Sequence, residues 1–373
     1  MSQRRNFGLD VVRMCAILPV MNVHFSMWAF KKAPDLVYIF GDMGVEIFFA
    51  LSGFLIGGII LRDFERGFSA RVALNFYIRR WMRTLPLYWV FFASNMFVTA
   101  AGFTLDPSWS VKCLAYLAFL QNLSWPMMAD WFQESWSLAV EEWFYLLFPV
   151  LFAALAGIKS RNRILAIALI LIIGSLGLRI ATYNPLADFD LSVRRVVILR
   201  LDAIAFGILA VWMVKTYPKK MRTLSKLVGL AGLAGIMLTV AMLLHAVPVS
   251  SFFLRTFSFS LTSASFSAIV VWAYYQSWDW VAHGTSASII GWFSTRSYAL
   301  YLCHGGVVRT MLHKGWFSHP PVVSALVFYP LVFLIAEVAH RLIERPFMRM
   351  RPAEIITARG EPAEIRQPLP NRH

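Results

Sequence analysis

The chain has 373 residues, of which 58% are apolar and only 15% are charged, and its mean hydropathy is +0.61. These values exclude an ordinary soluble globule and predict an all-α protein that crosses a membrane many times. We attribute the net charge of +15 to topology rather than to nucleic-acid binding, because Lys and Arg collect in the cytoplasmic loops of membrane proteins. The three cysteines show no paired spacing, so we expect neither a disulfide framework nor a metal site.

Ten apolar segments have the length of about twenty residues that a helix needs to span the hydrocarbon of a bilayer. They are residues 9–30, 43–62, 84–103, 137–156, 163–181, 196–214, 227–245, 252–275, 292–312 and 322–342. An eleventh segment, 112–127, is shorter and more polar, so we expect it to be interfacial or re-entrant. We expect no removable signal peptide, since the first apolar run is too long and too charged.

The basic residues orient the chain. If segment 112–127 does not span and the N-terminus is cytoplasmic, the cytoplasmic side holds 24 of the 35 basic residues and the outer side six. If that segment spanned, every later loop would change sides and the asymmetry would collapse. We therefore expect both termini in the cytoplasm, a membrane domain over residues 1–350, and a disordered tail over residues 351–373, which are rich in proline and charge.

The first span carries an arginine and a histidine on one helix face. Arg13 and His24 are eleven residues apart, which is about 1100°, or about 20° past three full turns, and about 16 Å along the axis. A cation inside a span usually faces a cavity or a pathway, because it costs about 3 kcal/mol at the centre of the bilayer. The alternative is that Arg13 only reaches the interface and that His24 only bonds a neighbouring helix.

A basic cluster precedes the third span. Arg79 and Arg83 are four residues apart and share a helix face, with Arg80 beside them. Ordinary topogenic charge would explain these arginines. The sharper interpretation is a clamp for phosphate groups, since guanidinium forks match phosphate oxygens.

Further polar residues lie inside other spans, at depths nearer the outer side. Glu46 and Glu141 are carboxylates within apolar segments, where a charge is costly and marks a functional site more often than a structural one. A lone buried histidine such as His304 usually bonds another helix, but His304 shares its approximate depth with His24. Arg200 and Asp202 are two residues apart and point to different faces, so a local ion pair between them is not implied.

At these residues the chain resembles the acyltransferase-3 family of membrane O-acyltransferases, which includes bacterial O-antigen, exopolysaccharide, Nod-factor and macrolide acyltransferases. The resemblance runs through almost the whole chain in seven ordered motifs. They are Leu9-Asp10 with Arg13 and His24, Gly44 to Phe49 leading to Ser52-Gly53, Arg79-Arg80 with Arg83, Pro86 and Tyr88, Trp136 to Tyr145, Arg200 with Asp202 and Gly207, Ser297 to His304, and Glu344-Arg345-Pro346. The family often has aspartate where this chain has Glu46. Many members also carry an esterase-like domain after the membrane part, and we expect none in these 373 residues.

The resemblance implies transfer of an acyl group, usually acetyl, from cytoplasmic acyl-coenzyme A to a hydroxyl of an extracytoplasmic or lipid-linked carbohydrate at a bacterial inner membrane. Acyl-coenzyme A would be a donor substrate, with no permanently bound cofactor, metal or nucleic acid. Arg13 and the cluster at Arg79–Arg83 would hold its phosphates. His24 would be the general base or a transient acyl carrier, with His304 as a second catalytic candidate, and Glu141 would orient a histidine or hold the acceptor.

Two other functions fit part of the sequence. A proton-coupled transporter would also place histidines and carboxylates inside its spans, but we find no inverted repeat or matching pair of broken segments. A non-catalytic protein of an envelope-polysaccharide system would tolerate replacement of Arg13 and His24. The acceptor, the acyl chain length and the oligomeric state are not encoded in any pattern that we can interpret.

Overall fold

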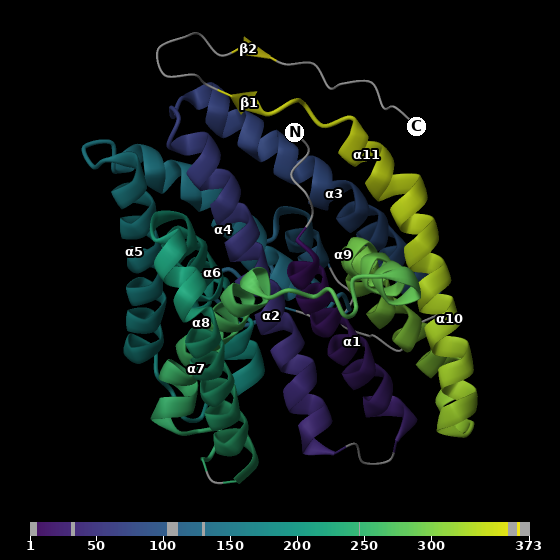
Figure 1. Ribbon diagram of the computed structural model, residues 1–373. Coiled ribbons are helices and arrows are strands. Elements are labelled where there is room, and N and C mark those ends of the chain that lie inside the picture. The colour runs from purple at the N-terminus through teal and green to yellow at the C-terminus, as the bar shows by residue number, and fades with distance from the viewer. Residues whose placement is uncertain are drawn as a thin grey trace.

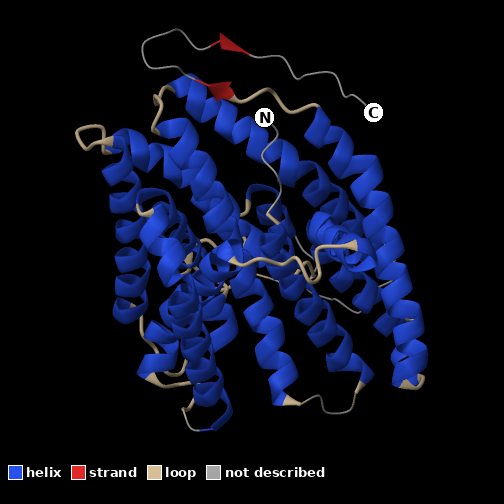
Figure 2. Cartoon of the chain, in the orientation of Figure 1, coloured by secondary structure: helices blue, strands red, loops and turns tan. Residues whose placement is uncertain are grey.

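The computed structural model describes residues 6–30, 34–102, 111–128, 131–245, 247–356 and 364–365. Within these residues the chain is almost entirely helical (Figure 2), which confirms the predicted all-α class. The long helices, drawn in Figure 1, are Phe7–Ala29 (α1), Asp35–Phe64 (α2), Ala70–Ala100 (α3), Ser135–Ala154 (α4), Ser160–Ala181 (α5), Leu201–Thr216 (α6), Pro218–His245 (α7), Phe252–Tyr275 (α8), Gly284–His313 (α9) and Pro321–Ala339 (α10). The shorter elements are Val111–Ala118 (η1), Asp190–Arg194 (η2), Val197–Leu199 (η3), Trp316–Ser318 (η4), His340–Glu344 (η5), Arg345–Arg349 (α11), Ile355–Ile356 (β1) and Glu364–Ile365 (β2).

Each long helix overlaps one of the predicted apolar segments. In the described part of the chain, seven helices are long and apolar enough to cross a membrane: α1, α2, α4, α5, α7, α8 and the helix that runs from α10 through α11. Helix α6 has 16 residues, α3 carries four arginines, and α9 carries two arginines among many Gly, Ser and Thr residues, so these three fall short in length or in composition. The fold is that of a multi-pass membrane protein.

Apolar side chains on the outer surface of the bundle fit a lipid surround. Helices α5, α7 and α10 lie at the periphery (Figure 1). They expose large apolar side chains such as Ile173, Leu230 and Leu326. In water such a surface would be unfavourable, whereas in a bilayer it faces hydrocarbon.

Helices α2 and α6 pack closely at the centre because glycines face each other. A Cβ at Gly53 would lie 2.0 Å from the carbonyl oxygen of Ile204, and one at Gly207 would lie 2.3 Å from that of Ala50. Small residues let helix backbones approach in this way, and packing of this kind drives helix association in lipid. The contact fixes α6 against the helix that carries Glu46 and Ser52.

Segment 112–127 is not a spanning helix, as predicted. It contains the short 3₁₀ helix η1, followed by turns. The fully buried side chains of Gln121 and Asn122 bond the start of α4, through the carbonyl oxygens of Ser135 and Trp136. Both amides donate to carbonyl oxygens in the first turn of α4, and these hydrogen bonds tie the segment to α4.

The predicted tail begins in contact with the bundle. Arg79 donates to the carbonyl oxygen of Pro352 and bonds Glu354 Oε1 at 3.0 Å, and Asn75 donates to the carbonyl oxygen of Ala353. Strand β1 pairs antiparallel with β2 in the register Ile355 to Ile365. Residues 357–363 and 366–373 lie outside the described part, so the disorder predicted for them stays a prediction.

Candidate active site

A cavity of about 340 Å³ enters the bundle between α1, α2, α3, α4 and α9. Three of the predicted donor-binding arginines, Arg13, Arg80 and Arg83, line it. The fourth, Arg79, bonds the tail segment instead. Within the described residues, Arg80 and Arg83 form no hydrogen bond or ion pair with another side chain. The cavity is therefore lined by cations that can bind an anion.

The electrostatics at the cavity mouth are those of a basic cluster. Arg351, which follows the last membrane helix, is half-buried near Arg83 and Arg79. Burial and these two neighbouring cations lower the pKa of Arg351 to about 10. Because Arg79 and Arg83 disfavour the charge on Arg351, the electrostatic potential here is positive, which favours a polyanionic ligand.

Glu141 lies along the same cavity, together with Ser52. Ser52 Oγ donates to Glu141 Oε1 at 2.7 Å, and the hydroxyl of Tyr145 donates to Oε2 at 3.0 Å. The adjacent Glu142 points elsewhere and accepts from Thr84 at 2.7 Å. Among the described residues, no hydrogen bond joins Glu141 to a histidine. Its predicted role at a histidine stays a prediction, and its position favours contact with a ligand in the cavity.

Arg13 is held by a short polar chain at the start of α1. Asp10 accepts from Ser294 Oγ at 2.7 Å, and Arg13 donates to the same hydroxyl at 3.3 Å. Asp10 and Arg13 also approach to 4.0 Å. Asp10 thus orients the arginine from behind while the guanidinium lines the cavity.

The two predicted histidines meet. His304 Nε2 lies 3.3 Å from His24 Nδ1, and their ring centroids are 4.8 Å apart. Sequence spacing placed them at a similar depth, and the packing of α1 against α9 brings them into contact.

Backbone carbonyls fix the tautomer of both rings. His24 Nδ1 lies 2.8 Å from the carbonyl oxygen of Val20, and His304 Nδ1 lies 3.1 Å from that of Leu300. Because a carbonyl only accepts, both neutral rings carry their hydrogen on Nδ1. His304 Nε2 then accepts from the His24 N–H, and His24 Nε2 is left with a free lone pair. A histidine held in this form can act as a base or as a nucleophile.

The inner part of the cavity approaches the histidine pair along α9. Tyr301 and Ser137 line it there, and their hydroxyls are 2.7 Å apart. The ring of Tyr301 is 5.7 Å from that of His304. His304 itself is one helical turn further along α9. The cavity thus connects the arginines to the layer of side chains directly beside the histidines.

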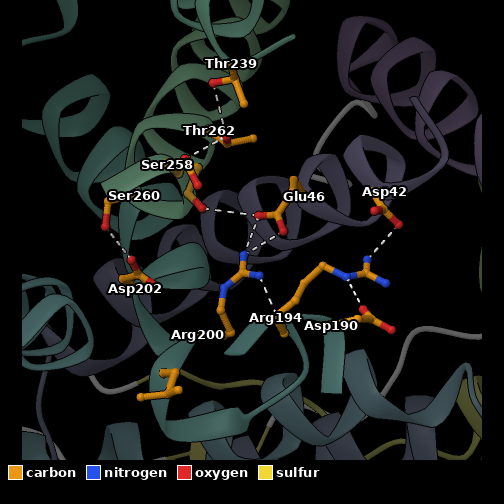
Figure 3. A network of polar contacts seen from close by, with 12 residues as sticks. Asp42, Glu46, Asp190, Arg194, Arg200, Asp202, Thr239, Ser258, Ser260 and Thr262 are labelled. Atoms are coloured by element: carbon orange, nitrogen blue, oxygen red, sulfur yellow. Dashed lines mark hydrogen bonds and ion pairs between the residues drawn. The ribbon is translucent and has the colours of Figure 1, made fainter. Parts of the chain in front are cut away.

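Glu46, Arg200 and Asp202 form buried ion pairs away from the cavity. Arg200 Nη2 bonds both carboxylate oxygens of Glu46, at 2.6 and 2.7 Å (Figure 3). Asp202 accepts from Arg179 Nη2 at 2.7 Å and from Ser260. Arg200 and Asp202 therefore each pair with a residue on another helix, as their different faces allow. These pairs join α2, α5, α6 and α8.

Arg194, beside this network, caps the same end of the bundle. It bonds Asp190 and Asp42, as Figure 3 shows. Burial raises the pKa of Asp190, but the charges of Arg194 and Arg195 outweigh it and hold that pKa below its ordinary value. This surface cluster orders the loop between α5 and α6.

A further buried carboxylate, Glu134, stands beside the histidines and was not identified from the sequence. It precedes α4 and is 4% exposed. Arg309 Nη1 donates to its Oε1 at 3.4 Å. Glu134 lies outside the apolar segments, so its burial could not be expected from the sequence pattern. The available signal was the glycine pair Gly305-Gly306 directly after His304, which opens the surface of α9.

The chain is similar in sequence to a protein family and to several bacterial O-acetyltransferases. Residues 6–340 match the model of a family described as "Acyltransferase domain". The peptidoglycan O-acetyltransferase OatA of Listeria monocytogenes is 26% identical over 366 residues, which cover 92% of this chain and 56% of that protein. A putative O-acetyltransferase of Staphylococcus aureus strain COL is 27% identical over 368 residues, covering 92% and 57%.

The putative peptidoglycan O-acetyltransferase YrhL of Bacillus subtilis is 24% identical over 369 residues, covering 91% of this chain and 54% of that protein. The chain thus spans little more than half the length of the curated relatives that it matches. No solved structure matches. Within the described residues, no group of His, Cys, Asp and Glu side chains could hold a metal ion.

Proposed function

Because the chain belongs to the acyltransferase-domain family, we propose that it is a membrane O-acyltransferase that moves an acetyl group from cytoplasmic acetyl-coenzyme A to a carbohydrate hydroxyl. The acceptor is extracytoplasmic or lipid-linked, and the protein lies in a bacterial plasma membrane with both termini in the cytoplasm. The names of two relatives mention peptidoglycan, so a cell-wall glycan is the first acceptor to test.

One observation carries the proposal: an arginine-lined cavity reaches Tyr301, whose ring is 5.7 Å from that of His304, although neither His304 nor His24 lines the cavity itself. Arg13, Arg80 and Arg83 match the phosphate groups of coenzyme A, since guanidinium groups bind phosphate with charge-assisted hydrogen bonds. The helix that carries Arg13 also carries His24, about 16 Å further along its axis. A donor bound by its phosphates at the arginines therefore extends its thioester toward the histidines.

The mechanism follows from the tautomer of His24. Its free Nε2 takes the proton of the acceptor hydroxyl while the hydroxyl oxygen bonds the carbonyl carbon of the thioester. The carbon–sulfur bond then breaks, and coenzyme A leaves as a thiolate that takes up a proton. In the second route Nε2 bonds the carbonyl carbon of the thioester, the carbon–sulfur bond breaks and coenzyme A leaves as a thiolate; the acceptor hydroxyl oxygen then takes the acyl group from Nε2, and the hydroxyl proton goes to the thiolate. Both routes need the lone pair that the Val20 contact leaves free.

Transfer of radiolabel from acetyl-coenzyme A into glycan and glycolipid fractions tests the proposal. Membranes with the native chain are compared with membranes carrying His24→Ala, and with His283→Ala as a control, because His283 is exposed at the start of α9. We expect label that depends on His24 and not on His283. Replacing a general base reduces transfer by about 10²- to 10⁴-fold.

Sealed vesicles test the orientation, because acetyl-coenzyme A does not cross a membrane. Inside-out vesicles should transfer label from external donor, and right-side-out vesicles should not. Equal transfer by the His24→Ala membranes would refute the assigned role. A lack of label in every fraction of acceptor-containing membranes would refute the proposed function.

A further inference from the structure

The Glu134 carboxylate packs against α9 at Gly305, where the absence of a side chain leaves room for it. A Cβ at Gly305 would lie 1.1 Å from Glu134 Oε1 and 2.3 Å from its carboxyl carbon. No side chain at position 305 is compatible with this placement. The carboxylate therefore lies against the backbone of the residue that directly follows His304.

The charge of Glu134 is only partly neutralised. Arg309 contacts Oε1 at 3.4 Å and is itself held by Asn95 Oδ1 at 2.6 Å. The second oxygen, Oε2, is buried and has no hydrogen-bond partner among the described residues. A buried carboxylate oxygen without a donor is costly, so its retention beside the histidines calls for a functional explanation.

We propose that Glu134 is the positioning acid of the histidine pair, and that its carboxylate stabilises the positive charge that forms when His24 takes up the acceptor proton. This inference rests on the proposed acyl transfer. Glu134 contacts neither donor nor acceptor and acts through His304 and His24. The role at a histidine that the sequence suggested for Glu141 is then filled by Glu134, which directly precedes α4.

The electrostatics agree with the geometry. The field of Glu134 acts on both His304 and His24. Burial raises the pKa of Glu134, but Arg309 and the two histidines outweigh it and keep that pKa below its ordinary value. Glu134 is therefore an anion at neutral pH, which is the form that the proposed role needs.

The surroundings of the pair contain few other charges that could take this role. Glu46 on α2 is neutralised by Arg200, and Glu141 on α4 accepts two hydroxyl hydrogen bonds. Other titratable or charged groups near this region, among the described residues, are Tyr301 and Arg309 on α9 and Tyr329 on α10, which bonds Asn22. Arg194 in η2 acts on Tyr301 rather than on the histidines.

The proton is accounted for throughout the step. The acceptor O–H bond breaks, the proton binds His24 Nε2, and the new C–O bond replaces the C–S bond of the thioester. While the imidazolium exists, its Nδ1–H bonds His304 Nε2, and Glu134, which lies against the backbone at Gly305, supplies the balancing negative charge. The imidazolium then returns the proton to the leaving thiolate or to water.

The pH dependence of kcat with Glu134→Gln tests the proposal. A nearby carboxylate favours the imidazolium, so removing it lowers the pKa of the base, and the acid limb of the profile moves to lower pH by about one unit. We expect kcat to fall about 10- to 100-fold, with the KM for acetyl-coenzyme A unchanged. Glu134→Asp should keep the position of the limb.

The matched control is Glu337→Gln, which removes a carboxylate that also bonds an arginine of α9, Arg296, outside the site. This variant should not move the acid limb. A uniform loss of activity by Glu134→Gln at every pH, or no loss, would overturn the inference. If Glu134→Gln does not fold, Gly305→Ala displaces the carboxylate instead and must shift the limb in the same direction.

A second readout does not need turnover. Diethyl pyrocarbonate modifies neutral imidazole, so the extent of modification of the peptide that contains His24, measured by mass spectrometry against pH, titrates that ring. Its midpoint should lie lower in Glu134→Gln than in the native chain. An unchanged midpoint overturns the role of Glu134 even where transfer is observed. If no acetyl transfer is observed but the midpoint of His24 modification is shifted, the proposed function is overturned and the coupling of Glu134 to His24 stands.

Discussion

If the basic cluster binds the donor as proposed, Glu354 competes with it for the arginines, and removal of Glu354 should tighten donor binding. Its carboxylate lies 2.9 Å from Arg62 Nη2 and 3.0 Å from Arg79 Nη2. It therefore occupies guanidinium groups that would otherwise be available to the phosphates of coenzyme A. Glu354→Ala should lower the KM for acetyl-coenzyme A and leave kcat unchanged.

The size of the effect follows from the exposure of the pairs. The side chain of Glu354 is 33% exposed and that of Arg79 is 20% exposed. Ion pairs at such sites contribute about 0.2–1 kcal/mol each after solvent screening. Releasing Arg79 and Arg62 therefore lowers KM by about two- to thirtyfold, and the difference shrinks at high salt, which screens both partners.

Initial rates of label transfer against donor concentration measure this KM at low and high salt. Glu65→Ala is the matched control: it removes one negative charge from the same side of the bundle, but from the pair with Arg161, whose Nε lies 2.8 Å from Glu65 Oε1. A KM that rises or stays constant in Glu354→Ala would refute the competition. An equal fall in both variants would show only a general effect of net charge.

Two further changes test stability. Glu46→Gln leaves the fully buried Arg200 without its anion, which should destabilise the protein by about 3–5 kcal/mol; an unchanged melting temperature in detergent would contradict this. Asp190→Asn should lower the melting temperature at pH 7, because the pKa of Asp190 is held below its ordinary value. That stabilisation is complete above the unfolded pKa of about 3.9 and is lost as the pH falls through the lower pKa of the folded state. The melting temperatures of the native and Asp190→Asn chains should therefore converge below about pH 4. A difference in melting temperature that stays constant with pH would contradict this role of Asp190.

The sequence predicted the helices because the bilayer restricts what can span it. A run of about twenty apolar residues has few structural choices, and all ten predicted segments became long helices. The shared face of Arg13 and His24 also follows from helix geometry alone. Segment 112–127 was separated from the spans by the distribution of Lys and Arg, and its polar residues Gln121 and Asn122 bond the start of α4.

Contacts between distant helices were beyond sequence reasoning. The depth of His304 indicated a relation to His24, but a single sequence does not show which faces of α1 and α9 meet. The partners of Arg200 and Asp202 lie on α2 and α5, 154 and 23 residues away along the chain. The docking of Glu354 on Arg79 joins residues 275 positions apart. Composition predicted disorder there, and the first residues of this tail are instead held by the basic cluster.

The arrangement of charge follows from the cost of burying it. Arg80 and Arg83 line the cavity and are only half-buried, so each retains some contact with solvent. Deeper in the bundle, Glu46, Asp202 and Glu134 each face an arginine, because an unpaired buried ion is far more costly than a paired one. The histidines differ, since a neutral imidazole can be buried with only its hydrogen bonds satisfied. In the proposed mechanism the histidines are the groups that change protonation, and the buried Glu134 beside them keeps one carboxylate oxygen without a hydrogen-bond partner among the described residues.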